Sequence, residues 1–102
     1  MRILITGSNG QLGSEIRDLV YLYKTTDFIF RDLHDLDICD FNALENFIIE
    51  QKVTGVINCA AYTDVDKAEE NSERVKQVNS EGVLNLVNAL KAVNGKLIHI
   101  ST

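Results

Sequence analysis

Four short apolar segments alternate along the chain with longer stretches in which apolar residues recur every three or four positions. The apolar segments are Arg2–Thr6, Asp27–Arg31, Val53–Cys59 and Lys96–Ser101. Near-continuous apolar runs of this length predict strands that are covered on both faces, as in a parallel sheet. We therefore expect one sheet whose strands are joined by helices.

The stretches between these strands carry the helical period. The first helix is predicted over Gln11–Tyr23 and the second over Phe41–Lys52, with Asp40 as its N-cap. The third begins near Ser72, and Gly95 is placed to end it as the left-handed C′ residue. The order is β-α-β-α-β-α-β, and 102 residues with 45% hydrophobic content suffice for one modest core.

This element order predicts an α/β fold in which right-handed crossovers join parallel strands. With the strand order 3-2-1-4, the two early helices would cover one face and the long third helix alone would cover the other. The switch point of the sheet would then lie between the first and fourth strands. Ligands of such sheets bind there, at the carboxyl ends of the strands.

The turn after the first strand carries the clearest chemical signal. Gly7, Gly10 and Gly13 are spaced G-x-x-G-x-x-G between the predicted strand and helix. We expect Gly7 to permit the tight turn, Gly10 to let the backbone approach a pyrophosphate, and Gly13 to allow close packing of the helix on the sheet. Free N–H groups at the helix start favour such an anion. Glycine clusters also form ordinary loops, but the flanking strand and amphipathic helix favour nucleotide binding.

Two charged residues end the second predicted strand. Asp32 falls 19 residues beyond Gly13, where a carboxylate would accept hydrogen bonds from the adenosine ribose hydroxyls. Arg31 would instead pair with a 2′-phosphate. Both NAD and NADP therefore stay open, and the alternative interpretation is a pair of solvated charges.

Charge and cysteine content exclude several classes of protein. Ten Lys and Arg stand against fifteen Asp and Glu, a net charge of −5, which disfavours a nucleic-acid or anionic-membrane partner. Cys39 and Cys59 form no C-x-x-C pair, and the N-terminus is not signal-like, so we expect half-buried thiols and a cytoplasmic location. No apolar stretch reaches membrane-spanning length.

Five blocks of the sequence resemble the dTDP-4-dehydrorhamnose reductases, a family in the extended branch of the short-chain dehydrogenase/reductase superfamily. The blocks are Met1–Ile16, Leu36–Asp40, Val56–Glu69, Val78–Leu86 and Ile98–Thr102. They occur in the family's order, and the similarity extends over the whole chain from Met1 to Thr102. The block N-C-A-A-Y-T-D-V-D-K-A-E separates this family from other extended short-chain reductases.

The resemblance implies an NAD(P)-binding Rossmann fold and NAD(P)H-dependent reduction of the 4-keto group of a dTDP-6-deoxy-hexulose to give dTDP-L-rhamnose. It also implies roles for individual residues: Gly7, Ser8, Asn9, Gly10, Gln11, Leu12 and Gly13 around the pyrophosphate, Arg31 and Asp32 at the ribose, Asp37 and Ile38 at the adenine, and Ala60, Ala61 and Tyr62 toward the nicotinamide. Thr102 matches the hydroxyl member of the family's Thr/Tyr/Lys catalytic set.

The family's Tyr-x-x-x-Lys pair is not found in these 102 residues. We therefore expect residues 1–102 to form an incomplete Rossmann domain that ends after its fourth strand and lacks the sugar-binding lobe. Such a chain would not transfer hydride unaided. The alternatives are another extended short-chain epimerase or dehydratase, and a non-catalytic NAD(P)-binding regulatory subunit.

Two further expectations concern metal and self-association. In some relatives an acidic residue on the first helix joins a Mg²⁺ site at a dimer contact, and Glu15 occupies that position. Its partner acids are missing, so we interpret Glu15 as a solvated helix residue and predict no metal site. The strand Lys96–Ser101 would present an unpaired edge, which favours a homo-oligomer.

Overall fold

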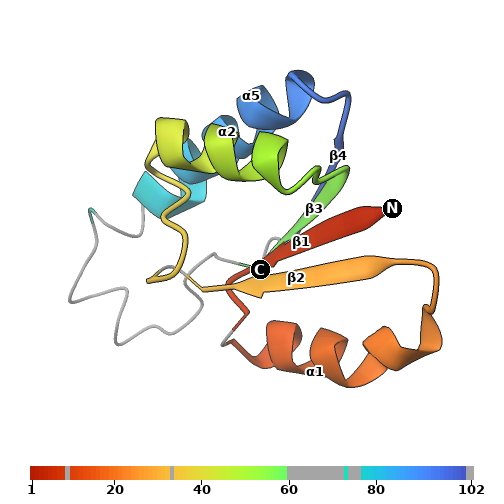
Figure 1. Ribbon diagram of the computed structural model, residues 1–102. Helices are drawn as coiled ribbons and strands as arrows, with labels where there is room; N and C mark the ends of the chain where they lie inside the picture. The colour runs from red at the N-terminus through yellow and green to blue at the C-terminus, as the bar shows by residue number, and fades with distance from the viewer. Residues whose placement is uncertain (9, 33, 60–72, 74–76, 101–102) are drawn as a thin grey trace.

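The computed structural model describes residues 1–8, 10–32, 34–59, 73 and 77–100, and shows a parallel sheet with helices on both faces (Figure 1). The strands are β1 (Arg2–Thr6), β2 (Asp27–Arg31), β3 (Gly55–Asn58) and β4 (Lys96–His99). The helices are α1 (Gln11–Leu19) with the 3-10 turn η1 (Val20–Leu22), α2 (Phe41–Glu50), and the π-helical turn η2 (Val78–Gly82) that continues into α5 (Val83–Lys91). The predicted α/β class and element order are confirmed.

The order of the strands differs from the expected 3-2-1-4. The four strands are parallel and run β2-β1-β3-β4 across the sheet. β1 is a central strand, and its neighbouring residues Leu4 and Ile5 are both fully buried on opposite faces. β2 lies at one edge and contains no fully buried residue. The expected order placed the Val53–Cys59 strand beyond β2, and it is wrong because β3 pairs with β1 on the side opposite β2. The mostly buried β3 is therefore an inner strand, and the less buried β2 lies at the edge.

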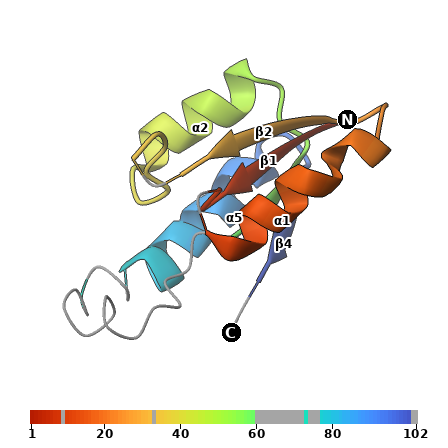
Figure 2. The ribbon, with the colours of Figure 1, turned by 90° about the horizontal axis from the view of Figure 1, so that it is seen from below.

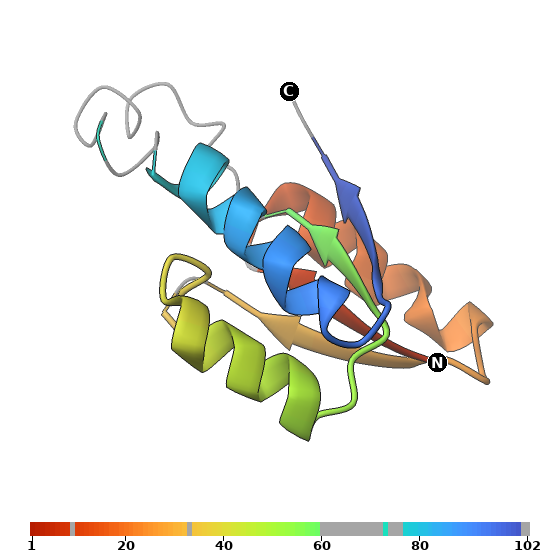
Figure 3. The same ribbon diagram turned by 90° about the horizontal axis from the view of Figure 1, so that it is seen from above.

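This strand order also changes which helices share a face. The crossover from β1 to β2 runs in one direction, whereas those from β2 to β3 and from β3 to β4 run in the other. Because crossovers are right-handed, α1 covers one face while α2 and α5 lie side by side on the other, as Figures 1, 2 and 3 show. The switch point therefore lies between β1 and β3, not between the first and fourth strands.

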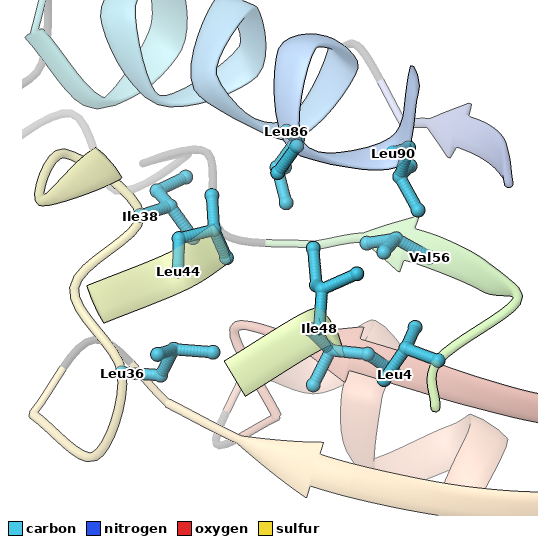
Figure 4. Close-up of a cluster of buried hydrophobic side chains, with 10 residues drawn as sticks. Leu4, Leu36, Ile38, Leu44, Ile48, Val56, Leu86 and Leu90 are labelled. Atoms are coloured by element: carbon cyan, nitrogen blue, oxygen red, sulfur yellow. The ribbon is translucent and has the colours of Figure 1, made fainter. Parts of the chain in front are cut away.

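The hydrophobic core lies between the sheet and the layer formed by α2 and α5 (Figure 4). Its buried members come from both helices, from β1 and β3, and from the segments that precede and follow α2. They are Leu4, Leu36, Ile38, Leu44, Ile48, Val53, Val56, Leu86, Ala89 and Leu90. The segment after β2 is thus anchored by its own apolar side chains, which fixes the backbone beside the carboxyl end of the sheet.

The helix ends follow local chemistry. The Asp40 carboxylate accepts a hydrogen bond from the Ala43 N–H at 3.2 Å, which confirms Asp40 as the N-cap of α2. At the end of α5 the left-handed residue is Asn94, with φ 53°, and not Gly95 as expected. Gly95 is the next residue, and its N–H donates to the Leu90 carbonyl at 2.9 Å in a Schellman arrangement. Its lack of a side chain serves packing, since a Cβ would lie 2.5 Å from Leu90 Cδ2.

Candidate functional site

The turn between β1 and α1 is held by backbone hydrogen bonds. Gly7 has φ 64°, a left-handed conformation that glycine adopts without strain. The Gly10 N–H donates to the Gly7 carbonyl at 3.1 Å and closes the turn. The Ser8 N–H donates to the Arg31 carbonyl at 3.2 Å, which joins the turn to the end of β2. This confirms that Gly7 makes the chain reversal possible at the carboxyl edge of the sheet.

The other two glycines meet different surroundings. A Cβ on Gly13 would lie 2.7 Å from both Cα and the carbonyl oxygen of Ser8, so this position excludes any side chain. Gly13 therefore packs closely against the glycine turn, whereas the sequence led us to expect close packing against the sheet. Among the described residues, a Cβ on Gly10 would meet only the Gly7 carbonyl, at 3.4 Å, an ordinary van der Waals contact. Packing within this part of the chain therefore does not require glycine at position 10.

The N-terminus of α1 adds hydrogen-bond donors beside Gly10. Gly10 is the N-cap, with extended φ −77° and ψ 174°, and provides no side chain to cap the helix. Helical geometry leaves the first-turn N–H groups of Gln11, Leu12 and Gly13 without intrahelical acceptors. With the positive end of the helix dipole, these groups form a suitable cradle for a phosphate or pyrophosphate.

Asp32 lies immediately after β2, beside the glycine turn. Its Oδ1 accepts hydrogen bonds from the N–H groups of His34 and Asp35, each at 2.9 Å. The hydrogen bond from the Asp35 backbone is the main cause that lowers the Asp32 pKa below the usual 3.8, although partial desolvation opposes it. Asp32 is therefore an ionised carboxylate held in a fixed orientation near neutral pH.

Arg31 takes a different direction from Asp32. Its guanidinium Cζ lies 5.5 Å from the centre of the Phe47 ring on α2, and its Nη1 donates to the Phe30 carbonyl at 2.8 Å. The cation is thus stacked on α2, on the core-facing side of the sheet. The structure places both expected ribose-binding residues at the end of β2, but only Asp32 lies beyond the strand in the loop.

The segment that leads into α2 carries the two expected adenine residues. Asp37 is half-buried, and its Oδ1 accepts a hydrogen bond from the Cys39 N–H at 2.9 Å. The Ile38 side chain is fully buried in the core, and its carbonyl accepts a hydrogen bond from Asn85 Nδ2 at 2.9 Å. Contact between Ile38 and a ligand would therefore involve its backbone.

A row of hydrogen-bonded polar side chains crosses the carboxyl ends of three strands, and the sequence did not reveal it. The buried Thr6 hydroxyl donates to Asn58 Oδ1, and Asn58 Nδ2 contacts Nδ1 of His99 at 3.0 Å. Thr6, Asn58 and His99 occupy the same register position on β1, β3 and β4. The row lies at the switch point and ties these strand ends together. The only sequence signal was a polar residue at each strand end.

Several expected site residues fall outside the described part of the chain: Asn9, Ala60, Ala61, Tyr62 and Thr102. Glu15 is exposed on α1, and within the described residues no group of three His, Cys, Asp or Glu side chains could hold a metal ion. Cys39 and Cys59 are half-buried and form no disulfide, and burial raises the pKa of the Cys59 thiol. In the same described part, no helix has the length and apolar character needed to cross a membrane.

The comparisons with known proteins identify the family. The family described as "RmlD substrate binding domain" matches residues 1–102. This chain belongs to the RmlD family. The resemblance to dTDP-4-dehydrorhamnose reductases is therefore confirmed.

Individual RmlD-family relatives are similar over nearly all of this chain. The dTDP-4-dehydrorhamnose reductase of Mycolicibacterium smegmatis is 44% identical over 101 residues, which are 99% of this chain and 30% of that protein. A crystal structure of the Clostridium acetobutylicum reductase is 43% identical, with a TM-score of 0.85, over 95% of this chain and 34% of the other. The Bacillus anthracis reductase, solved in complex with NADP, is 34% identical with a TM-score of 0.87, over 98% of this chain and 36% of the other. The chain thus spans about a third of the length of these relatives.

Proposed function

We propose that this chain forms the NAD(P)H-binding part of a dTDP-4-dehydrorhamnose reductase. Membership of the RmlD family supports this proposal, as does the NADP complex of the Bacillus anthracis relative. The activity belongs to a protein about three times as long as this chain, judged by the relatives it matches. The proposal therefore assigns cofactor binding to residues 1–102 and the sugar site to the rest of such a protein.

The observation that carries the proposal is the position of Gly10. Among the described residues this glycine has no packing role, and it lies between the left-handed Gly7 and the start of α1, whose first N–H groups have no intrahelical acceptors. A pyrophosphate fits this cradle, since it needs close approach to backbone donors and no intervening side chain. Ser8, Asn9, Gln11 and Leu12 would surround the pyrophosphate with the three glycines, as the family resemblance implies.

The remaining cofactor contacts follow from the same placement. Asp32 would accept hydrogen bonds from the adenosine ribose, and Asp37 and the Ile38 backbone would border the adenine. Ala60, Ala61 and Tyr62 would line the path to the nicotinamide, and Thr102 would stand in the catalytic set, as the family resemblance implies. Arg31 would reach a 2′-phosphate only by leaving its contact with Phe47.

When bound, the cofactor would supply a hydride to the keto carbon of the dTDP-sugar. The residues of this chain would bind and orient that cofactor, with Asp32 and Asp37 beside its adenosine half. Because these 102 residues contain no Tyr-x-x-x-Lys pair to deliver the proton, we expect them to bind NADPH without reducing a sugar. Two unlinked cysteines agree with function in a reducing compartment such as the cytoplasm.

Titration of the purified protein with NADPH and NADH, followed by nucleotide fluorescence, tests this proposal. Gly10→Val should place a branched side chain in the cradle and weaken NADPH binding roughly 100-fold, about 2.7 kcal/mol, while the circular dichroism spectrum is unchanged. Thr25→Val, in the exposed loop before β2 at the opposite edge of the sheet, is the matched control and should bind like the wild type. A folded Gly10→Val protein with wild-type affinity would refute the site.

The same titration addresses cofactor preference. Tighter binding of NADH would assign recognition to the Asp32 carboxylate, whose fixed orientation suits a pair of ribose hydroxyls. Tighter binding of NADPH would mean that Arg31 leaves Phe47 to pair with the 2′-phosphate.

A further inference from the structure

Asn85 on α5 is not among the residues proposed to contact the cofactor, but it makes a long-range contact within the protein. Its Nδ2 donates to the Ile38 carbonyl at 2.9 Å, across 47 positions of sequence, and the side chain is half-buried. The bond joins α5 to the segment between β2 and α2. Asn88, one turn later on the same helix, is exposed. The two asparagines therefore differ in surroundings although they share a residue type and a helix.

The carbonyl that Asn85 holds belongs to the same peptide group as the Cys39 N–H. That N–H donates to Asp37 Oδ1 at 2.9 Å. One rigid, planar peptide unit thus accepts a hydrogen bond from Asn85 on one side and donates a hydrogen bond to the Asp37 carboxylate on the other. Rotation of this peptide would break both bonds, so Asn85 and Asp37 are mechanically coupled.

The packing around this peptide leaves it little freedom. The Ile38 side chain is fully buried, and a Cβ on Gly82 would lie only 2.5 Å from Ile38 Cδ1. Gly82 ends the π-helical turn η2, which leads directly into α5 and Asn85. The start of α5 is therefore fitted closely to Ile38, and Asn85 supplies the polar contact within an apolar interface.

We propose that Asn85 is a positioning residue for adenine recognition: through the Ile38–Cys39 peptide it sets the orientation of the Asp37 carboxylate toward the 6-amino group of the base. This inference rests on the proposed cofactor function. Asn85 itself touches no ligand in this account. A carboxylate accepts hydrogen bonds from an amino group and is repelled by a carbonyl oxygen, so its orientation determines how well the base is distinguished.

The test compares NADPH with its hypoxanthine analogue, in which a carbonyl oxygen replaces the 6-amino group. The wild type should bind NADPH about tenfold more tightly than the analogue. Asn85→Leu should reduce this preference to less than about twofold, since the peptide then loses its donor. Asn88→Leu, the matched control on the exposed side of α5, should keep the tenfold preference. Asn85→Ala serves as the second variant, because it removes the donor without added bulk.

Each outcome separates a positioning role from a merely structural one. Equal weakening of both cofactors by the Asn85 variants, with the preference unchanged, would overturn the inference. A wild type that binds both cofactors equally would also overturn it, while leaving cofactor binding intact. A folded wild type that binds neither cofactor would instead refute the proposed function, and with it the inference.

Discussion

At the scale of single residues, Gly10 and Gly13 show how the same residue type serves two purposes three positions apart. Gly13 is buried and lies against the backbone of Ser8, so its lack of a side chain is a requirement of folding. Gly10 is exposed and has room for a Cβ. Its backbone is extended, with φ −77°, which any residue adopts. The requirement for glycine at position 10 therefore comes from the proposed ligand.

This difference predicts opposite sensitivities to alanine. Gly13→Ala should lower the free energy of unfolding by about 2 kcal/mol, because the Cβ forces backbone atoms apart. Gly10→Ala should change it by less than about 0.5 kcal/mol, since the reduced entropy of the unfolded chain offsets a poorer N-cap. Urea denaturation of both variants measures these effects. Equal destabilisation by the two substitutions would contradict the assignment of roles.

Asp32 gives a prediction about pH. Hydrogen bonds from backbone N–H groups lower its pKa in the folded state below 3.8. The stabilisation from this carboxylate is therefore fully present above the unfolded-state pKa, about 3.9, and is lost as the pH falls through the lower folded-state value. An NMR titration of the Asp32 carboxyl carbon should give a midpoint below 3.8, and Asp32→Asn should lose less stability than the wild type over that acidic window. A midpoint at or above 3.8 would contradict the hydrogen-bonded turn.

At the scale of elements, local pattern was sufficient for most of the fold. The apolar runs and helical periods located all four strands and the α1 and α2 helices, and Asp40 was correctly placed as a cap. Strand order was not predictable, because pairing depends on which elements meet across the sheet. Whether the third strand pairs with β2 or with β1 is decided by tertiary contacts, which the apolar character of Val53–Cys59 alone does not reveal.

In the candidate site, too, some features were predictable from the sequence and others were not. The glycine turn and Asp32 were recognisable as candidates because the roles proposed for them follow from spacing along the chain. The row formed by Thr6, Asn58 and His99 depends on the register of three strands, and the Asn85 contact joins positions 47 apart. Such relations become visible only when the topology is known. The sequence therefore predicted the turn proposed to bind the ligand, but not the side-chain contacts that surround it.

At the scale of the whole molecule, two surfaces lie in different parts of the fold. The glycine turn lies at the carboxyl ends of the strands. A groove of about 400 Å³ lies instead between the end of α5 and the start of β4, and it is lined by Val87, Leu90, Lys91, Asn94, Gly95, Lys96 and Leu97. β4 is the last strand of the sheet, so its outer edge has no partner strand among the described residues, and self-association there stays a prediction. We expect the dinucleotide to bind at the glycine turn and not in this groove.

Amide chemical-shift mapping of the ¹⁵N-labelled protein during an NADPH titration tests this placement most directly. The account predicts that the amides of Gly7, Gly10, Gln11, Asp32 and Asp37 shift and saturate together, while those of the α5–β4 groove stay unchanged. These residues cover the pyrophosphate, ribose and adenine positions in one experiment. Shifts confined to the groove, or none in a folded protein, would contradict the account.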